Sequence, residues 1–138
     1  MIERHERKAR ILVLEDNPAD VDLLRRALGA AEVDCELTVI DDGAEALTLV
    51  REAGEAALLA LVIIDLNLPK HSGIEILKEM RANQRFSHLP VIVLSSSVTG
   101  REKDKMDRFH VERFVTKPLD LDEFLGIGLI VKELLADR

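Results

Sequence analysis

Short apolar runs and longer amphipathic segments alternate along the whole chain. Continuous apolar runs occupy residues 11–14, 61–64 and 91–94, and such runs predict strands that are buried on both faces of a parallel sheet. Residues 35–40 alternate polar with apolar positions, which predicts an edge strand with one face in water. A shorter run at residues 114–116 predicts the final strand.

Between these runs, apolar residues recur at helical spacing, and capping residues precede several of the segments. Asn17 followed by Pro18 is a typical helix start, while Ser72 and Thr99 each precede a glutamate at capping-box spacing. Helices are therefore predicted over residues 18–29, 44–54, 72–80, 99–109 and 120–136.

These elements form strand–helix repeats, which predict an α/β fold: a doubly wound, five-stranded parallel sheet with helices on both faces. A chain of 138 residues is typical of one domain with a sizeable core. We assign residues 10–138 to this domain. Residues 1–9 are polar and charged, and we expect them to form a flexible N-terminal arm.

The composition narrows the class of protein. Hydrophobic residues make up 47% of the chain and charged residues 33%, which is typical of a globular domain. The net charge of −7 argues against a general affinity for DNA or for an anionic membrane. No apolar run is long enough to cross a bilayer, and from the charged N-terminus we expect no signal peptide. We therefore expect a cytoplasmic protein.

Polar residues follow four of the five predicted strands. Glu15 and Asp16 follow the first strand, Asp65 ends the third, Ser95 follows the fourth, and Lys117 follows the fifth. The carboxyl ends of parallel strands meet at one edge of the sheet, where open α/β folds bind their ligands. These side chains are therefore expected to lie together.

This combination indicates phosphoryl-transfer chemistry. Three clustered carboxylates repel one another unless a cation compensates them, and Mg²⁺ prefers such hard oxygen ligands. Asp65 is a candidate nucleophile that would form an aspartyl phosphate. The Lys117 ammonium and the Ser95 hydroxyl suit phosphoryl oxygens, and phosphoryl transfer requires mainly positioning and charge neutralisation.

The same residues carry a resemblance to a known family. They are the acidic pair Glu15-Asp16, Asp65 in Asp-Leu-Asn-Leu-Pro, Ser95 in Val-Leu-Ser, and Lys117 followed by proline. With these motifs at matching spacings, the chain resembles the receiver domain of two-component response regulators from about residue 9 to residue 135. The resemblance implies a flavodoxin-like sheet of strand order 2-1-3-4-5, and a phosphoacceptor rather than a turnover enzyme.

The resemblance also implies which residues bind the phosphoryl group and the metal. Asp65 would accept the phosphoryl group from the phosphohistidine of a sensor histidine kinase. Mg²⁺ would be held by Glu15, Asp16, Asp65 and the backbone carbonyl of Asn67, with Glu15 acting largely through water.

A conformational switch is implied as well. Ser95 and Lys117 would hold the phosphoryl oxygens, and the Lys117–Pro118 peptide is expected to be cis, since cis bonds occur at X–Pro. Ser95 would move toward the phosphoryl group, and Phe114 would turn inward into the vacated space. The face formed by the fourth helix, the fifth strand and the fifth helix would then be remodelled for protein–protein signalling or phosphorelay.

Within the family, residues 17–24, 65–70 and 94–97 look like those of small stand-alone receivers encoded with phytochrome-type histidine kinases. We expect no DNA-binding or catalytic domain after Arg138. Output through protein contacts or a phosphorelay is therefore expected.

The last helix carries an apolar stripe wider than one buried face requires. Its excess residues are Ile127, Ile130 and Leu134. We expect these residues to form a partner surface, most simply a homodimer interface.

Two other functions are compatible with the pattern. The first is a Mg²⁺-dependent phosphatase with an aspartyl intermediate, which usually needs a second carboxylate two residues after the nucleophile as general acid. Asn67 occupies that position, which disfavours turnover. The second is a receiver-like binding module that is never phosphorylated, and the intact set of site residues argues against it.

Overall fold

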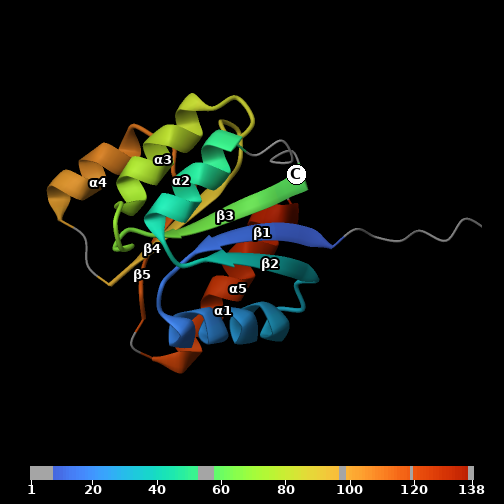
Figure 1. Cartoon of the computed structure of the whole chain (residues 1–138). Helices are drawn as coiled ribbons and strands as arrows, with labels where there is room; N and C mark the ends of the chain where they lie inside the picture. Colours follow the sequence, from blue (N-terminus) through green and yellow to red (C-terminus); the bar gives the residue numbers. More distant parts are fainter. Residues whose placement is uncertain (1–7, 53–57, 97–98, 119, 137–138) are drawn as a thin grey trace, which may run out of the picture.

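The computed structural model describes residues 8–52, 58–96, 99–118 and 120–136. Within these residues five strands alternate with five helices (Figure 1). In chain order they are β1 (Ala9–Leu14), α1 (Pro18–Ala30), β2 (Cys35–Ile40), α2 (Gly43–Glu52), β3 (Leu59–Asp65), α3 (Gly73–Ala82), β4 (Val91–Ser95), α4 (Gly100–Asp107), β5 (Arg113–Thr116) and α5 (Leu121–Ala136).

All neighbouring strands pair in parallel, in the order β2-β1-β3-β4-β5. The predicted fold class and strand order are confirmed. Ala9 already belongs to β1, while residues 1–7 of the expected arm lie outside the described residues. Among the described helices, none combines the length and the apolar character that a membrane span needs.

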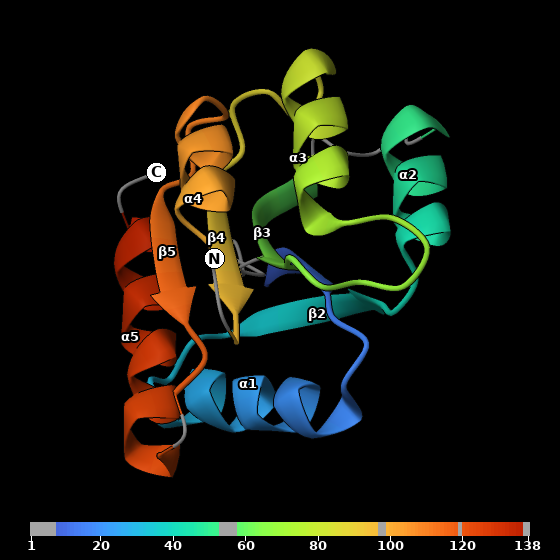
Figure 2. The ribbon, with the colours of Figure 1, turned by 90° about the vertical axis from the view of Figure 1, so that its left-hand side faces the viewer.

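The sheet lies between two helical layers (Figures 1 and 2): α2, α3 and α4 cover one face, and α1 and α5 cover the other. Successive residues of β1 alternate between the two cores, because side chains of a strand point to opposite faces in turn. Leu12 and Leu14 join the core under α2 to α4, while Ile11 and Val13 join the core under α1 and α5. This explains why the central strands read as continuous apolar runs.

The helices α1 and α5 cross at very close range. A Cβ atom placed on Gly128 of α5 would overlap with the carbonyl oxygen of Ala27 in α1. The neighbouring Ile127 is 2% exposed and packs in the core with Leu24 and Leu28 of α1. Leu129 is the most exposed of the large apolar residues of α5, at 62%.

The expectation that Ile127 lies on a partner surface is therefore wrong. Ile130 and Leu134 are half-buried and pack against the same core. The apolar stripe of α5 is wide because this helix contacts both the sheet and α1, so two of the protein's own surfaces cover it.

Arg81 of α3 holds two loops in place through its guanidinium group. It donates hydrogen bonds to five backbone carbonyls: Phe86 (3.2 Å), Ser87 (3.1 Å), Leu89 (2.8 Å), Phe109 (2.6 Å) and His110 (2.9 Å). The first three carbonyls precede β4, and the last two lie between α4 and β5. One side chain thus ties α3 to both connections.

The two predicted capping boxes differ in the structure. At the start of α4, Thr99 and Glu102 form both reciprocal hydrogen bonds. At the start of α3, the Ser72 hydroxyl accepts from the Glu75 N–H at 3.3 Å, but the Glu75 carboxylate binds His71 Nδ1 at 2.8 Å. Only the serine half of the second box is present, because a histidine competes for its glutamate.

The helix crossing yields a stability prediction with a matched control in the same helix. Gly128→Ala should destabilise the protein by about 1–3 kcal/mol, because the added methyl group forces α1 and α5 apart. Gly126→Ala, where a Cβ meets no atom within 4 Å, should be neutral or stabilise the helix by up to ~1 kcal/mol. Urea unfolding measures both changes. Equal free energies of unfolding for the two variants would contradict the close crossing.

Candidate functional site

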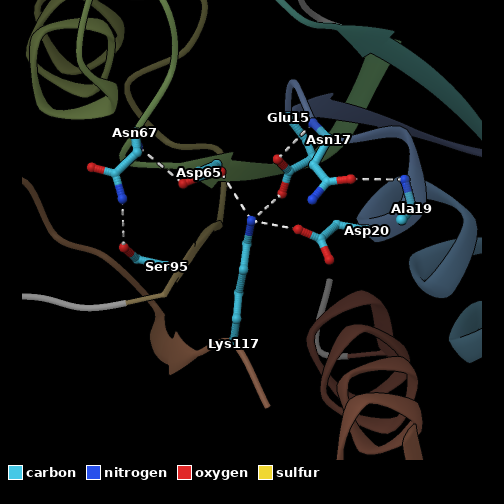
Figure 3. Close-up of polar contacts among 8 residues, drawn as sticks. All are labelled: Glu15, Asn17, Ala19, Asp20, Asp65, Asn67, Ser95 and Lys117. Atoms are coloured by element: carbon cyan, nitrogen blue, oxygen red, sulfur yellow. Dashed lines mark hydrogen bonds and ion pairs between the residues drawn. The ribbon is translucent and has the colours of Figure 1, made fainter. Parts of the chain in front are cut away.

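The carboxyl edge of the sheet brings the predicted strand-end residues together (Figure 3). Asp65 ends β3, Ser95 ends β4, and the residues after β1 and β5 contribute Glu15 and Lys117. Carboxylate oxygens of Glu15, Asp16 and Asp65 all lie within 4.8 Å of one another. Asp16 is exposed at the rim, whereas Glu15, Asp65 and Ser95 are buried.

The Lys117 ammonium lies at the centre of this cluster. Its Nζ is 2.7 Å from Glu15 Oε1, 2.7 Å from Asp20 Oδ2 and 3.0 Å from Asp65 Oδ2 (Figure 3). Burial opposes the charge, but the attraction of these carboxylates outweighs the effect of burial and raises the pKa of Lys117 above its ordinary value. Lys117 therefore stays protonated and serves as the resting counter-ion of the acidic edge.

Asp20 is a site residue that sequence reasoning missed. It lies in the first turn of α1, where an acidic side chain is ordinary because it favours the helix N-terminus. The signal available in the sequence was its position in the first turn of the helix that Asn17 caps. That helix begins shortly after the carboxyl end of β1.

Glu15 is the most perturbed acid of the site. Its side chain is 2% exposed, and burial raises its pKa to about 7, with Asp65 adding to the effect and Lys117 opposing it. Its Oε2 accepts a hydrogen bond from the Asn17 N–H at 3.1 Å. Within the described residues, Oε1 accepts no hydrogen bond of good geometry despite its ion pair with Lys117.

These features fit a hard divalent cation. Three carboxylates converge, and one buried oxygen of Glu15 has spare capacity to accept. Carboxylate oxygens are the hard ligands that Mg²⁺ and Mn²⁺ prefer. Protonation of Glu15 and cation binding are two ways of relieving the same repulsion. The backbone carbonyl of Asn67 stays a predicted further ligand.

Asn67 links the carboxylate of Asp65 to β4. Its backbone N–H donates to Asp65 Oδ1 at 2.9 Å, and its side-chain amide lies 3.5 Å from Ser95 Oγ. Phe114 is half-buried and packs against the core under α2 to α4. The coupled movement of Ser95 and Phe114 stays a prediction.

The expected cis peptide between Lys117 and Pro118 is wrong, since no peptide bond among the described residues is cis. The trans form is favoured by about 0.5–1 kcal/mol at X–Pro bonds. With this bond trans, the Lys117 N–H donates to the Ser95 carbonyl at 2.7 Å and Nζ still reaches the carboxylates, so the resting site does not demand the less favourable isomer.

The loop after Asp65 is braced by the start of α2, another contact that sequence reasoning missed. Lys70 Nζ lies 2.7 Å from Asp42 Oδ2, which lowers the pKa of Asp42, and the Gly43 N–H donates to the Pro69 carbonyl at 3.0 Å. A Cβ on Gly43 would lie 2.6 Å from the His71 carbonyl oxygen. Glycine is thus required for this approach.

Comparison with known proteins gives consistent matches. The model of the response regulator receiver domain matches residues 11–127. The response regulator Rcp1 of Synechocystis sp. is 33% identical over 116 residues, which are 82% of this chain and 79% of Rcp1.

Solved structures of response regulators also resemble this chain. The phosphorylated cyanobacterial phytochrome response regulator RcpA superposes with a TM-score of 0.82 at 32% identity, covering 94% of this chain and 95% of that one. The Mn²⁺-bound form of Rcp1 superposes with a TM-score of 0.78 at 30% identity, covering 91% and 92%.

The raised pKa of Glu15 predicts a pH-dependent affinity for divalent cations. Below pH 7 a proton increasingly occupies Glu15 and competes with the metal, so the affinity at pH 6 should be about tenfold weaker than at pH 8. Glu15→Gln should weaken binding and flatten this dependence, while Asp34→Asn, at the opposite edge of the sheet beside Lys8, should retain it. The chain lacks Trp and Tyr, so calorimetric titration is the suitable measurement. The same pH dependence in Glu15→Gln would contradict the assignment.

Proposed function

The chain belongs to the response regulator receiver domain family, and we propose that it accepts a phosphoryl group on Asp65 from a sensor histidine kinase, with Mg²⁺ as cofactor. The observation that carries this proposal is the position of Asp65. Its carboxylate lies beside two further acids that suit a cation and 3.0 Å from a permanently charged lysine.

The two oxygens of Asp65 are held differently. Oδ1 accepts from the Asn67 N–H, and Oδ2 pairs with Lys117. In the proposed reaction, an Asp65 oxygen attacks the phosphorus of a phosphohistidine, the P–N bond breaks, and the imidazole leaves as the new acyl phosphate forms. The bound cation would neutralise charge on the phosphoryl oxygens, while Lys117 and Ser95 would bind those oxygens.

The phosphoryl group adds roughly two negative charges to Asp65. Ser95, completely buried at the end of β4, would donate its hydroxyl hydrogen to a phosphoryl oxygen. Phe114 of the adjacent β5 would follow it inward. Because Arg81 binds the carbonyls of Phe109 and His110, a movement of α4 and β5 would have to rearrange these hydrogen bonds.

Receiver domains are phosphoacceptors and not turnover enzymes, and the relatives found for this chain are named as regulators. The alternative of a phosphatase lacks support in the site, since Asn67 stands where a general acid would be needed. The alternative of an unphosphorylated binding module would leave the complete acidic cluster and its lysine without a use.

Partners follow by analogy to the relatives. RcpA is named as a phytochrome response regulator, so a phytochrome-type histidine kinase in the cytoplasm is the proposed donor. Output would pass through protein contacts or a phosphorelay rather than DNA. A second copy of the chain is the proposed partner of the outer surface of α5, around Leu129 with the half-buried Ile130 and Leu134.

The phosphoacceptor can be tested with a small acyl phosphate. With Mg²⁺ the wild-type protein should gain one phosphoryl group in its intact mass, and Asp65→Asn should gain none while keeping its circular dichroism spectrum. A chelator should abolish the gain in the wild type. Phosphorylation of Asp65→Asn, or an unmodified wild type that binds Mg²⁺, would refute the proposal.

The switch can be tested by hydrogen exchange. Phosphorylation should alter exchange of the Phe109 and Glu112 amides, which bond to the Met106 and Val91 carbonyls. Ser95→Ala should be phosphorylated but lose most of this change, because no hydroxyl reaches the phosphoryl group. Ser87→Ala, in the loop before β4, is the control and should respond like the wild type. An unaltered response in Ser95→Ala would argue against the switch.

A further inference from the structure

Asp20 makes a contact that helix stability alone does not explain. Its Oδ2 lies 2.7 Å from Lys117 Nζ, and the two side chains are 17% and 11% exposed. By contrast, Asp22 of the same helix turn is 62% exposed and pairs with Arg26 at 3.2 Å. Asp22 is an ordinary surface acid, whereas Asp20 points into the site (Figure 3).

The local structure fixes where Asp20 lies. The Asn17 side chain accepts from the Ala19 N–H at 2.9 Å and caps α1, while the Asn17 N–H is itself held by Glu15. The helix start is therefore anchored to the acidic edge. This anchoring sets the rotation of the first turn and directs the carboxylate of Asp20 toward Lys117.

Three carboxylates surround the ammonium group of Lys117. A lysine ammonium has three hydrogens to donate. Glu15 and Asp20 are the nearer partners at 2.7 Å each, and Asp65 is the more distant at 3.0 Å. Nζ donates hydrogen bonds to Asp20 and Asp65, while Glu15 contributes an ion pair. The two partners from the β1–α1 segment therefore hold the ammonium on that side, and another of its hydrogens is directed to Asp65.

Asp20 differs from Glu15 in one decisive respect. Glu15 belongs to the group of carboxylates that converge on a possible cation position, and Asp20 does not. A cation coordinated by Glu15 would weaken the ion pair between this carboxylate and Lys117. Asp20 then remains as the anion dedicated to the lysine.

We propose that Asp20 is a positioning residue that holds Lys117 so that one ammonium hydrogen faces Asp65 and then the phosphoryl group formed on it. This inference rests on the proposed phosphorylation of Asp65. When Asp65 becomes an acyl phosphate, its oxygen loses charge, and the ammonium hydrogen that had faced Asp65 is donated in a hydrogen bond to a phosphoryl oxygen instead, while Lys117 stays protonated. The ion pair between Lys117 and Asp20 need not break. Lys117 can therefore contact first Asp65 and then the phosphoryl group while it stays bound to Asp20.

The test is a double-mutant cycle on the rate of phosphorylation by a small acyl phosphate at saturating Mg²⁺. Asp20→Asn, which keeps the shape and removes the charge, should slow the wild-type rate about tenfold but leave the slower rate of Lys117→Met unchanged, because coupled residues are not additive. Asp22→Asn is the matched control and should react like the wild type. Asp20→Ala serves as a second variant and should show the same pattern.

Three results would overturn the proposal: an unchanged rate in Asp20→Asn, a faster rate, or an equal loss in the Lys117→Met background. The last result would show that Asp20 acts through the helix and not through the lysine.

A second measurement does not depend on phosphorylation. In the metal-free protein, an amine-reactive acetylating reagent followed by peptide mass spectrometry reports the reactivity of Lys117 relative to the exposed Lys78. Asp20→Asn should raise this ratio severalfold, and Asp22→Asn should not. A raised ratio with no phosphorylation of the wild type would refute the proposed function but retain the anchoring of Lys117. An unraised ratio in a phosphorylated protein would refute the anchoring alone.

Discussion

The ion pairs of Lys117 stabilise the carboxyl edge of the sheet, where the clustered carboxylates would otherwise repel one another. Two unit charges 4.8 Å apart, the upper limit of the spacing within the acidic group, repel by about 3.5 kcal/mol at an effective dielectric constant of ~20. Lys117 offsets part of this repulsion, but burial, with a smaller contribution from Asp65, still raises the pKa of Glu15 to about 7. The resting site is thus deficient in positive charge, and a divalent cation would relieve that deficiency.

The rest of the fold keeps Lys117 in register with its partners. Its backbone N–H binds the Ser95 carbonyl, which ties the end of β5 to the end of β4. On the other side, the crossing at Gly128 sets α5 against α1, and α1 carries Asp20. Lys117 and Asp20 are far apart in sequence, so their pairing depends on both the sheet and the helix crossing. A shift in either would separate the lysine from one of its carboxylates.

Residues fixed by topology could be predicted from sequence, while those fixed by packing could not. Asp65, Ser95 and Lys117 follow from strand ends, because parallel pairing brings every such end to one edge. Asp20 depends on the rotation of α1 about its axis, which a strand–helix pattern does not specify. Ile127 was assigned to a partner surface because the pattern does not show that α1 covers a second face of α5. The Lys117–Pro118 isomer was missed because the two forms differ by only about 0.5–1 kcal/mol.

The two helical layers are held with unequal strength, and this inequality favours one direction for a signal. On one side, α1 and α5 pack so closely that there is no room for a methyl group at Gly128. On the other, α4 is short, and Met106 is its only buried residue among those described. Just beyond the end of α4, Arg81 donates hydrogen bonds to the carbonyls of Phe109 and His110, and Phe109 is only partly buried against the core. The extra charge of the proposed phosphorylation at Asp65 would therefore meet a tightly packed layer through Lys117 and Asp20, and a less tightly packed one through Ser95 and β5, so the structural response should concentrate around α4 and β5.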